Sequence, residues 1–143
     1  MIYVIFSNPE YNKAFNFILP GLSITFLSTI ISFVIALFLG LISGIGRISK
    51  NKLASTISRT YIEFIRGVPV LILIFTIAFV VVVRGAEFFN INNGNVPMLV
   101  RAIIALSVFY GAYIAEVFRA GIESVPVGQR EGGASLGLTD RQV

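Results

Sequence analysis

The chain contains no cysteine and no histidine, and its single aspartate is at position 140. Their absence excludes thiol nucleophiles, zinc or haem sites built from cysteine and histidine, and histidine-based triads. It also removes any indication of redox compartment. Hydrolytic chemistry would depend on glutamate, lysine, serine or tyrosine alone. We therefore expect no catalytic residue, no metal site and no cofactor on this chain.

Charged residues are also scarce. They make up 13% of the 143 residues, whereas 56% are hydrophobic and the mean hydropathy is +0.89. Soluble domains carry about 25% charged residues, so the composition predicts an all-α integral membrane protein. The net charge of +4 comes from basic residues at the ends of apolar segments. We therefore expect contact with anionic lipid head groups and none with nucleic acid.

Three apolar segments are long enough to form membrane helices. The first uncharged run covers 14–46, which as helix would be roughly 50 Å long, more than the hydrocarbon core of about 30 Å. Proline suits a first helical position, so the sequence predicts that the first helix begins at Pro20. The predicted helices are about 20–45, 60–83 and 98–120.

The distribution of lysine and arginine predicts the orientation of these helices, because cytoplasmic loops carry the excess. One side would carry eight basic residues: Arg47, Lys50, Lys52, Arg59, Arg66, Arg119, Arg130 and Arg141. The other side would carry three: Lys13, Arg84 and Arg101. We expect a multi-pass protein of the bacterial inner or plasma membrane, with segment 1–17 outside and the C-terminal loop in the cytoplasm.

Small residues recur every fourth position in the first helix, at Ser28, Ser32, Ala36, Gly40 and Gly44. Residues four apart share a helix face, and small side chains let another helix approach closely. The stripe predicts helix packing within the chain or, alternatively, a contact between two copies.

Polar residues also interrupt the third apolar segment, at Ser107, Tyr110, Gly111 and Tyr113. A polar stripe in a membrane helix often faces a water-filled path, so these four are candidates for a translocation path. The alternative is a tyrosine at the membrane interface and a hydroxyl bonded to a neighbouring helix.

The approach to the second apolar segment contains Glu63, Arg66, Gly67 and Pro69. Glu63 and Arg66 are spaced to pair on one helix face. Gly67 permits unusual backbone angles and Pro69 fixes φ. The combination predicts a bend where the chain enters the membrane, or simply a cytoplasmic helix cap.

The segment after the third apolar run is polar. Glu116, Arg119 and Glu123 have the spacing of a charge ladder on an exposed helical extension. A second short helix is predicted over 129–136, ended by Gly137 as a left-handed cap.

The stretch 111–139, GAYIAEVFRAGIESVPVGQREGGASLGLT, resembles the cytoplasmic loop of bacterial ABC importer permeases, in particular the polar amino-acid uptake family. Ile65–Pro69, IRGVP, is similar to that family's signature before its second helix. The family loop has Glu-Ala-Ala, three residues, then Gly. Here Glu131 matches the acidic residue, Gly132 and Gly133 replace the alanines, and Gly137 matches the glycine.

The resemblance covers about 18–143 and implies a type I ABC importer transmembrane domain. That domain has five helices, so we expect the sequence to break off after the third helix and within a coupling loop, 121–143. The residues assigned to coupling are Gly128, Gln129, Glu131, Gly132, Gly133 and Gly137. The resemblance also implies cytoplasmic ATPase subunits that bind ATP and magnesium, a second permease subunit, identical or different, and an extracellular or periplasmic substrate-binding protein.

Other functions stay open from the residues alone. A non-transporting helical scaffold or a channel subunit is the alternative, although the first two apolar segments lack the mid-membrane ionisable residue that an ion path favours. An intramembrane enzyme is excluded by the missing histidine, cysteine and aspartate pairs. Polar amino acids as substrate follow from the resemblance alone.

Overall fold

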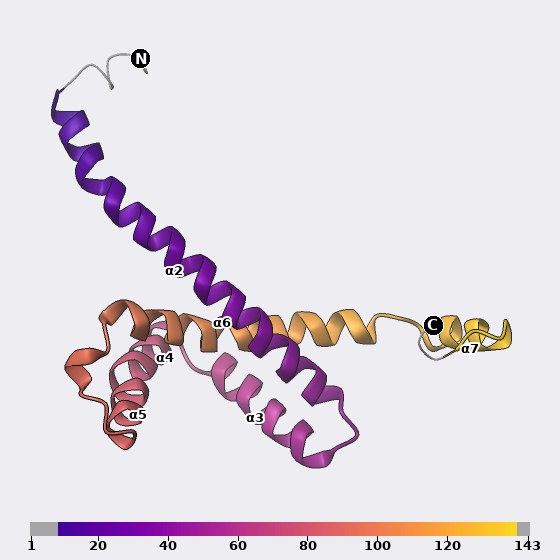
Figure 1. Cartoon of the computed structure of the whole chain (residues 1–143). Helices are drawn as coiled ribbons and strands as arrows, with labels where there is room; N and C mark the ends of the chain where they lie inside the picture. Colours follow the sequence, from indigo (N-terminus) through magenta and orange to yellow (C-terminus); the bar gives the residue numbers. More distant parts are fainter. Residues whose placement is uncertain (1–8, 140–143) are drawn as a thin grey trace.

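The computed structural model describes residues 9–139, and within that range the chain is helical, without strands. Figure 1 shows a long helix crossing a second one, with shorter helices packed below and a last helix apart. The elements are α2 (Pro9–Ile48), α3 (Lys52–Gly67), α4 (Val70–Thr76), a π-helical turn η1 (Ile77–Val81), α5 (Val82–Phe88), a 3₁₀ turn η2 (Asn93–Asn95), α6 (Met98–Glu123) and α7 (Val127–Ser135).

Helix α2 begins at Pro9 rather than near Pro20, so the predicted start is wrong. Pro20 lies inside the helix, where its missing N–H removes one backbone bond. Membrane helices tolerate such a proline because neighbouring groups compensate for the lost bond. Residues 9–17, assigned to an external segment, continue this helix, and residues 1–8 lie outside the described range. Its 40 residues extend about 60 Å.

The second apolar segment is not one helix over 60–83. It is divided between α3, which begins earlier, and the run from α4 to α5. Val68 is extended at the break and Pro69 precedes α4 with φ −55° and ψ 133°, because a residue before proline is driven out of the helical region. The predicted bend is therefore present. The π-helical turn η1 was not predicted.

Helix α6 packs across α2, and the small-residue stripe forms the contact. A Cβ on Gly40 would lie 2.5 Å from Ile114 Cγ2, and one on Gly44 would lie 2.9 Å from the Ala115 carbonyl oxygen. Ser32 and Ala36 are buried on the same face. The stripe thus serves packing within the chain, the first of its two interpretations.

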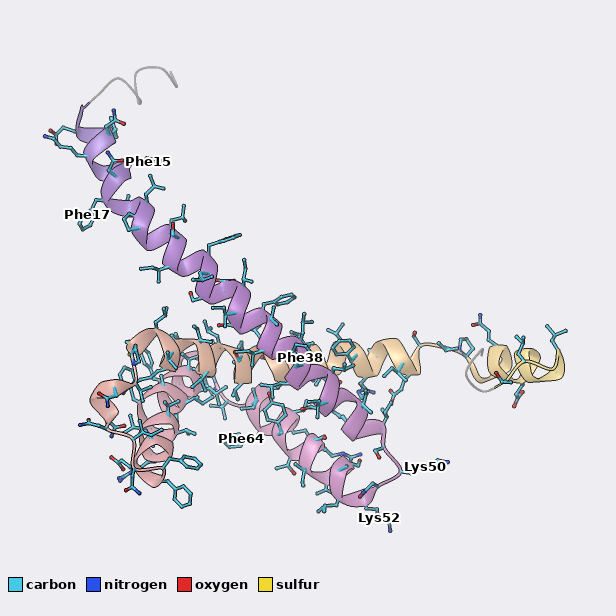
Figure 2. The ribbon with its side chains drawn as sticks, viewed as in Figure 1. Phe15, Phe17, Phe38, Lys50, Lys52 and Phe64 are labelled. Atoms are coloured by element: carbon cyan, nitrogen blue, oxygen red, sulfur yellow. The ribbon has the colours of Figure 1, made fainter. Side chains whose placement is uncertain are left out.

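Within residues 9–139, three helical segments have the length and hydropathy of membrane spans: Glu10–Ile48, Val70–Phe88 and Met98–Glu123. The hydrophobic core between these spans and α3 is small and is centred on Ile65, Leu73, Ile77 and Phe109. Most large apolar side chains elsewhere point outward, as along the free part of α2 that carries Phe15 and Phe17 in Figure 2. Such outward apolar faces suit lipid or further membrane helices.

Candidate functional site

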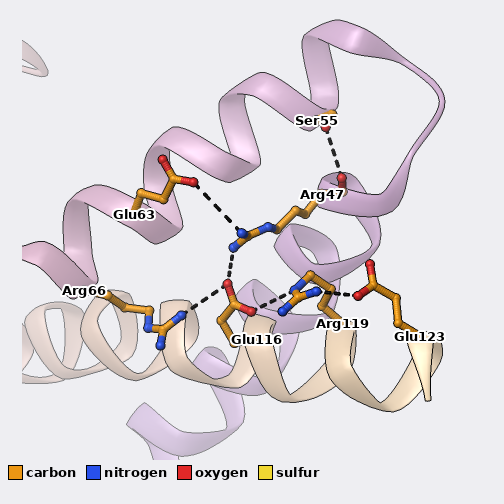
Figure 3. Close-up of polar contacts among 7 residues, drawn as sticks. All are labelled: Arg47, Ser55, Glu63, Arg66, Glu116, Arg119 and Glu123. Atoms are coloured by element: carbon orange, nitrogen blue, oxygen red, sulfur yellow. Dashed lines mark hydrogen bonds and ion pairs between the residues drawn. The ribbon is translucent and has the colours of Figure 1, made fainter.

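A charged cluster joins three helices at one end of the bundle (Figure 3). Its centre is Glu116 of α6, whose side chain is only 16% exposed. One carboxylate oxygen pairs with Arg47 of α2 and lies 3.2 Å from Arg66 of α3. The other accepts a hydrogen bond of 2.8 Å from Nε of Arg119. One carboxylate thus holds guanidinium groups from α2, α3 and its own helix.

Further contacts surround this Glu116 cluster. Glu63 Oε1 lies 4.0 Å from Arg47, and Arg119 also pairs with Glu123. Within the described range the cluster therefore combines three arginines and three glutamates. The Arg66 guanidinium lies 5.6 Å from the centre of the Tyr113 ring, a cation–π distance. The ends of α2, α3 and α6 are accordingly fixed to one another by charge as well as by packing.

Two sequence expectations need correction here. Glu63 and Arg66 do not pair with each other, because each faces a partner on another helix. The Glu116–Arg119–Glu123 ladder exists, but Glu116 is not a surface residue. Its position follows from the face it shares with fully buried Ala112, one turn earlier. That spacing was the signal that could have located it.

Tyr61 of α3 ties the same helices together further inside. Its hydroxyl donates a hydrogen bond of 2.6 Å to the Val108 carbonyl oxygen of α6. Burial raises the pKa of Tyr61 to about 12, because the buried phenolate would lose its hydration. A Cβ on Gly111 would lie 2.9 Å from this hydroxyl. Glycine at 111 therefore makes room for the bond.

The four candidate path residues do not gather on one surface. Ser107 is buried, and its hydroxyl donates to the Ile103 carbonyl at 2.7 Å and lies 3.2 Å from that of Ser32. Gly111 is buried too, whereas Tyr110 and Tyr113 are exposed. Tyr110 borders an apolar hollow of about 400 Å³ between α2 and α6.

The short helix after α6 has the predicted form. Helix α7 spans Val127–Ser135, and Gly137 has φ +78°. The Leu138 N–H donates to the Gly133 carbonyl at 3.1 Å, which is the six-to-one bond of a Schellman cap. This left-handed position favours glycine. The residues that the resemblance assigns to coupling therefore lie in α7 or in the cap that ends it.

Helix α7 stands clear of the bundle in Figure 1, beyond the end of α6. Gly128, Gln129, Glu131 and Gly132 are all exposed, and a Cβ at Gly128 or Gly132 would meet nothing within 4 Å. Packing against the described residues therefore does not require glycine at these two positions. A partner surface could approach this backbone closely.

The model of the binding-protein-dependent transport system inner membrane components matches residues 36–143. The chain belongs to this family. The match includes the α2–α6 contact, the Glu116 cluster and α7. The resemblance to bacterial ABC importer permeases is thus confirmed.

Several similar proteins are permeases for amino acids. The glutamate transport system permease protein GluD of Corynebacterium glutamicum is 35% identical over 88% of this chain and 44% of its own length. The L-cystine transport system permease protein TcyB of Bacillus subtilis is 35% identical over 85% of this chain and 49% of its own length. The histidine/lysine/arginine/ornithine permease protein HisQ of Escherichia coli is 35% identical over 88% of this chain and 57% of its own length.

A solved chain, described as the crystal structure of an amino acid ABC transporter with histidines, has the same fold. The TM-score is 0.75 and the identity 31%, over 92% of this chain and 58% of that chain. The all-α fold of an ABC importer permease is therefore established for the described residues. The chain spans about half the length of the curated relatives it matches.

Proposed function

We propose that this chain is part of the membrane-spanning permease subunit of a bacterial importer for polar amino acids. ATP hydrolysis on a separate cytoplasmic ATPase would drive it, so the chain is not itself an enzyme. The observation that carries the proposal is α7, an exposed, glycine-capped helix placed directly after a membrane span in a member of this family. The amino-acid substrates named for the relatives support the substrate class.

Helix α7 has the chemistry of a docking element. Glu131 provides one negative charge for a basic side chain of the ATPase, and Gln129 provides hydrogen-bonding groups. Gly128, Gly132 and Gly133 provide a small surface, as the alanines of the family pattern would at 132 and 133. ATP and magnesium would bind to the ATPase and not to this chain.

The Glu116 cluster would connect α7, through α6, to the ends of α2 and α3. Helix α6 ends at Glu123, only a short turn before α7. Because Glu116 joins α6 to Arg47 and Arg66, a displacement of α7 would move the ends of α2 and α3 together with α6. The cluster would thus act as a rigid joint.

The proposed translocation path runs along α6, past Ser107, Tyr110, Gly111 and Tyr113. Tyr110 has the exposed position of a path-lining residue, next to the hollow between α2 and α6. Tyr113 would be held by Arg66. Ser107 and Gly111 would act indirectly, since both fit α6 against its neighbours.

Orientation and assembly complete the proposal. The cluster brings Arg47, Arg66 and Arg119 to one end of the bundle, which supports their assignment to the cytoplasmic side of the inner or plasma membrane. The N-terminal segment would then be outside. A second permease subunit and an external substrate-binding protein would complete the importer.

Co-purification with an ATPase tests the proposal. The full-length protein is tagged, expressed in its own host, and its partners are identified by mass spectrometry. We expect a cytoplasmic ABC ATPase that is lost in E131R and retained in the matched charge reversal E87R. Glu87 is a suitable control because it lies at the C-terminal end of the second span, on the side assigned to the outside. The variant G132A/G133A should retain it, because each change favours the helix by about 1 kcal/mol.

Two results would contradict the proposal. One is the absence of any ATPase from the purified protein. The other is an ATPase retained by E131R and lost in E87R, which would place the contact on the opposite side and favour a scaffold or channel subunit.

A further inference from the structure

Helix α3 has an apolar stripe that its own bundle does not cover. Its inner face is buried through Ile62 and Ile65, which are 0% and 5% exposed. Leu53, Ile57 and Phe64 lie on a different face and are 70%, 61% and 63% exposed. Their spacing of four and seven residues aligns them along the helix. This outer stripe has no partner within the described part of the chain.

A basic groove lies beside the stripe. It has a volume of about 380 Å³ and is lined by Ser49, Lys50, Lys52, Ser55, Thr56, Arg59, Thr60 and Glu63. Of these, Lys50, Lys52 and Arg59 make no ion pair within residues 9–139, while Glu63 faces Arg47. The groove therefore carries three unpaired positive charges and one partly neutralised negative charge.

Hydroxyl groups add hydrogen-bond donors to these charges. The Ser55 hydroxyl is occupied, since it donates to the Arg47 carbonyl at 3.0 Å. The hydroxyls of Thr56 and Thr60 form no hydrogen bond within the described residues. Unpaired ammonium and guanidinium groups next to free hydroxyls suit a phosphate group with several acceptor oxygens.

The stripe and the groove have the geometry of a helix at a membrane surface. At about 100° per residue, Lys52 and Arg59 lie roughly a quarter to a third of a turn from Leu53. Figure 2 shows Lys50 and Lys52 at the turn that begins α3 and Phe64 towards its other end. Lysine and arginine side chains have apolar stems, so their charged ends reach the lipid head groups while neighbouring apolar side chains enter the acyl region. The adjoining spans, which contain α2 and α4, also carry exposed apolar side chains.

We propose that α3 begins at the membrane interface and that its basic groove binds the phosphate head group of an anionic phospholipid. The acyl chains would lie along Leu53, Ile57 and Phe64. Lys50, Lys52 and Arg59 would neutralise the phosphate, with Thr56 and Thr60 donating hydrogen bonds. This lipid site is separate from α7 and does not depend on ATPase coupling. Each basic residue near an anionic surface strengthens attraction about fivefold.

The experiment uses a fluorophore at the stripe. The chain has no cysteine, so I57C in the full-length protein, with any other cysteine replaced, accepts one bimane label. The labelled protein is reconstituted in phosphatidylcholine bilayers with one fifth phosphatidylglycerol. In one sample the phosphatidylglycerol carries brominated acyl chains, and in a second sample an equal mole fraction of the phosphatidylcholine carries them. The ratio of the two bimane quenching efficiencies gives the local enrichment of the anionic lipid.

We expect several-fold enrichment of phosphatidylglycerol at position 57. It should be lost in K50Q/K52Q, so that both lipids quench equally, and it should persist in K13Q/R84Q, which removes the same charge from the opposite ends of the helices. Equal quenching by both lipids, or quenching by aqueous iodide instead of bromolipid, would overturn the proposal. Loss of enrichment on adding inorganic phosphate at constant ionic strength would also overturn it, because the groove would then select the free ion.

Discussion

Replacing Glu116 by glutamine tests whether the charged cluster holds α2, α3 and α6 together. Glutamine has the same shape, but it removes the negative charge that faces Arg47, Arg66 and Arg119. The three guanidinium groups would then lie within a few ångströms of one another without a central counter-ion. The Glu63 and Glu123 carboxylates would remain at the margin only.

The magnitude follows from the burial of the carboxylate. Breaking a buried ion pair costs about 3–5 kcal/mol. The Glu116 side chain is 16% exposed and the Arg66 side chain 45% exposed, so water relieves part of this cost. We therefore predict that E116Q lowers the free energy of unfolding by about 2–3 kcal/mol.

Glu123 provides a matched control. It lies on the same helix, shares Arg119 as partner and is 51% exposed. Exposed ion pairs contribute little to stability, so E123Q should leave the unfolding midpoint unchanged. The two variants remove the same charge by the same substitution, and they differ in burial and in the number of arginines contacted.

The assay is thermal unfolding of the purified full-length protein in detergent, followed by circular dichroism at 222 nm. E116Q should unfold several degrees below the unmodified protein. In 1 M salt, where the Debye length is about 3 Å, most of the effect should persist because the Arg47–Glu116 pair at the centre of the cluster is largely shielded from solvent. An E116Q midpoint equal to that of E123Q would refute the idea that Glu116 fixes the three helices.

Two further predictions concern the helix contacts. G44A should destabilise the protein by about 1–3 kcal/mol through overpacking, since its Cβ would meet the Ala115 carbonyl oxygen at 2.9 Å. The control G21A, in the same helix, should not destabilise the protein, because its Cβ would have no neighbour within 4 Å. Equal unfolding midpoints of the two variants would contradict the close α2–α6 contact. The Tyr61 phenol, whose pKa is raised to about 12, should ionise near pH 12 in an absorbance titration at 295 nm, and Y61F should lack that component. Because the folded pKa exceeds the unfolded value of 10.0, the Tyr61 contribution to stability should be complete below pH 10 and disappear as the pH rises through 12; a Tyr61 that titrates near 10 would contradict its burial.

Local features were predictable where one residue type has one strong backbone preference. Gly137 takes the left-handed angle that its spacing after a polar helix indicated. Pro69 forces Val68 out of the helical region, so the bend before the second span was visible in the sequence. The small residues of α2 indicated close helix packing, although the sequence left open which partner they contact.

Features that depend on two distant elements were not predictable in the same way. Glu116 looked like an exposed ladder residue because sequence spacing shows only partners on the same helix. Its contacts with Arg47 and Arg66 require α2 and α3 to pack against α6 first. The predicted start at Pro20 was wrong for a different reason, because the long apolar helix continues on both sides of this proline. The π-helical turn Ile77–Val81 lies in a uniform apolar run without glycine or proline.

Transport into proteoliposomes tests the central claim most directly. The full-length permease is reconstituted with its co-purified ATPase and the substrate-binding protein, with ATP and magnesium inside the vesicles, and uptake of radiolabelled polar amino acids is measured. The account predicts accumulation that requires ATP and is abolished by E131R in α7, while E87R transports normally. ATP-independent flux, or ATP-driven uptake that is unaffected by E131R, would contradict a permease coupled to its ATPase through α7.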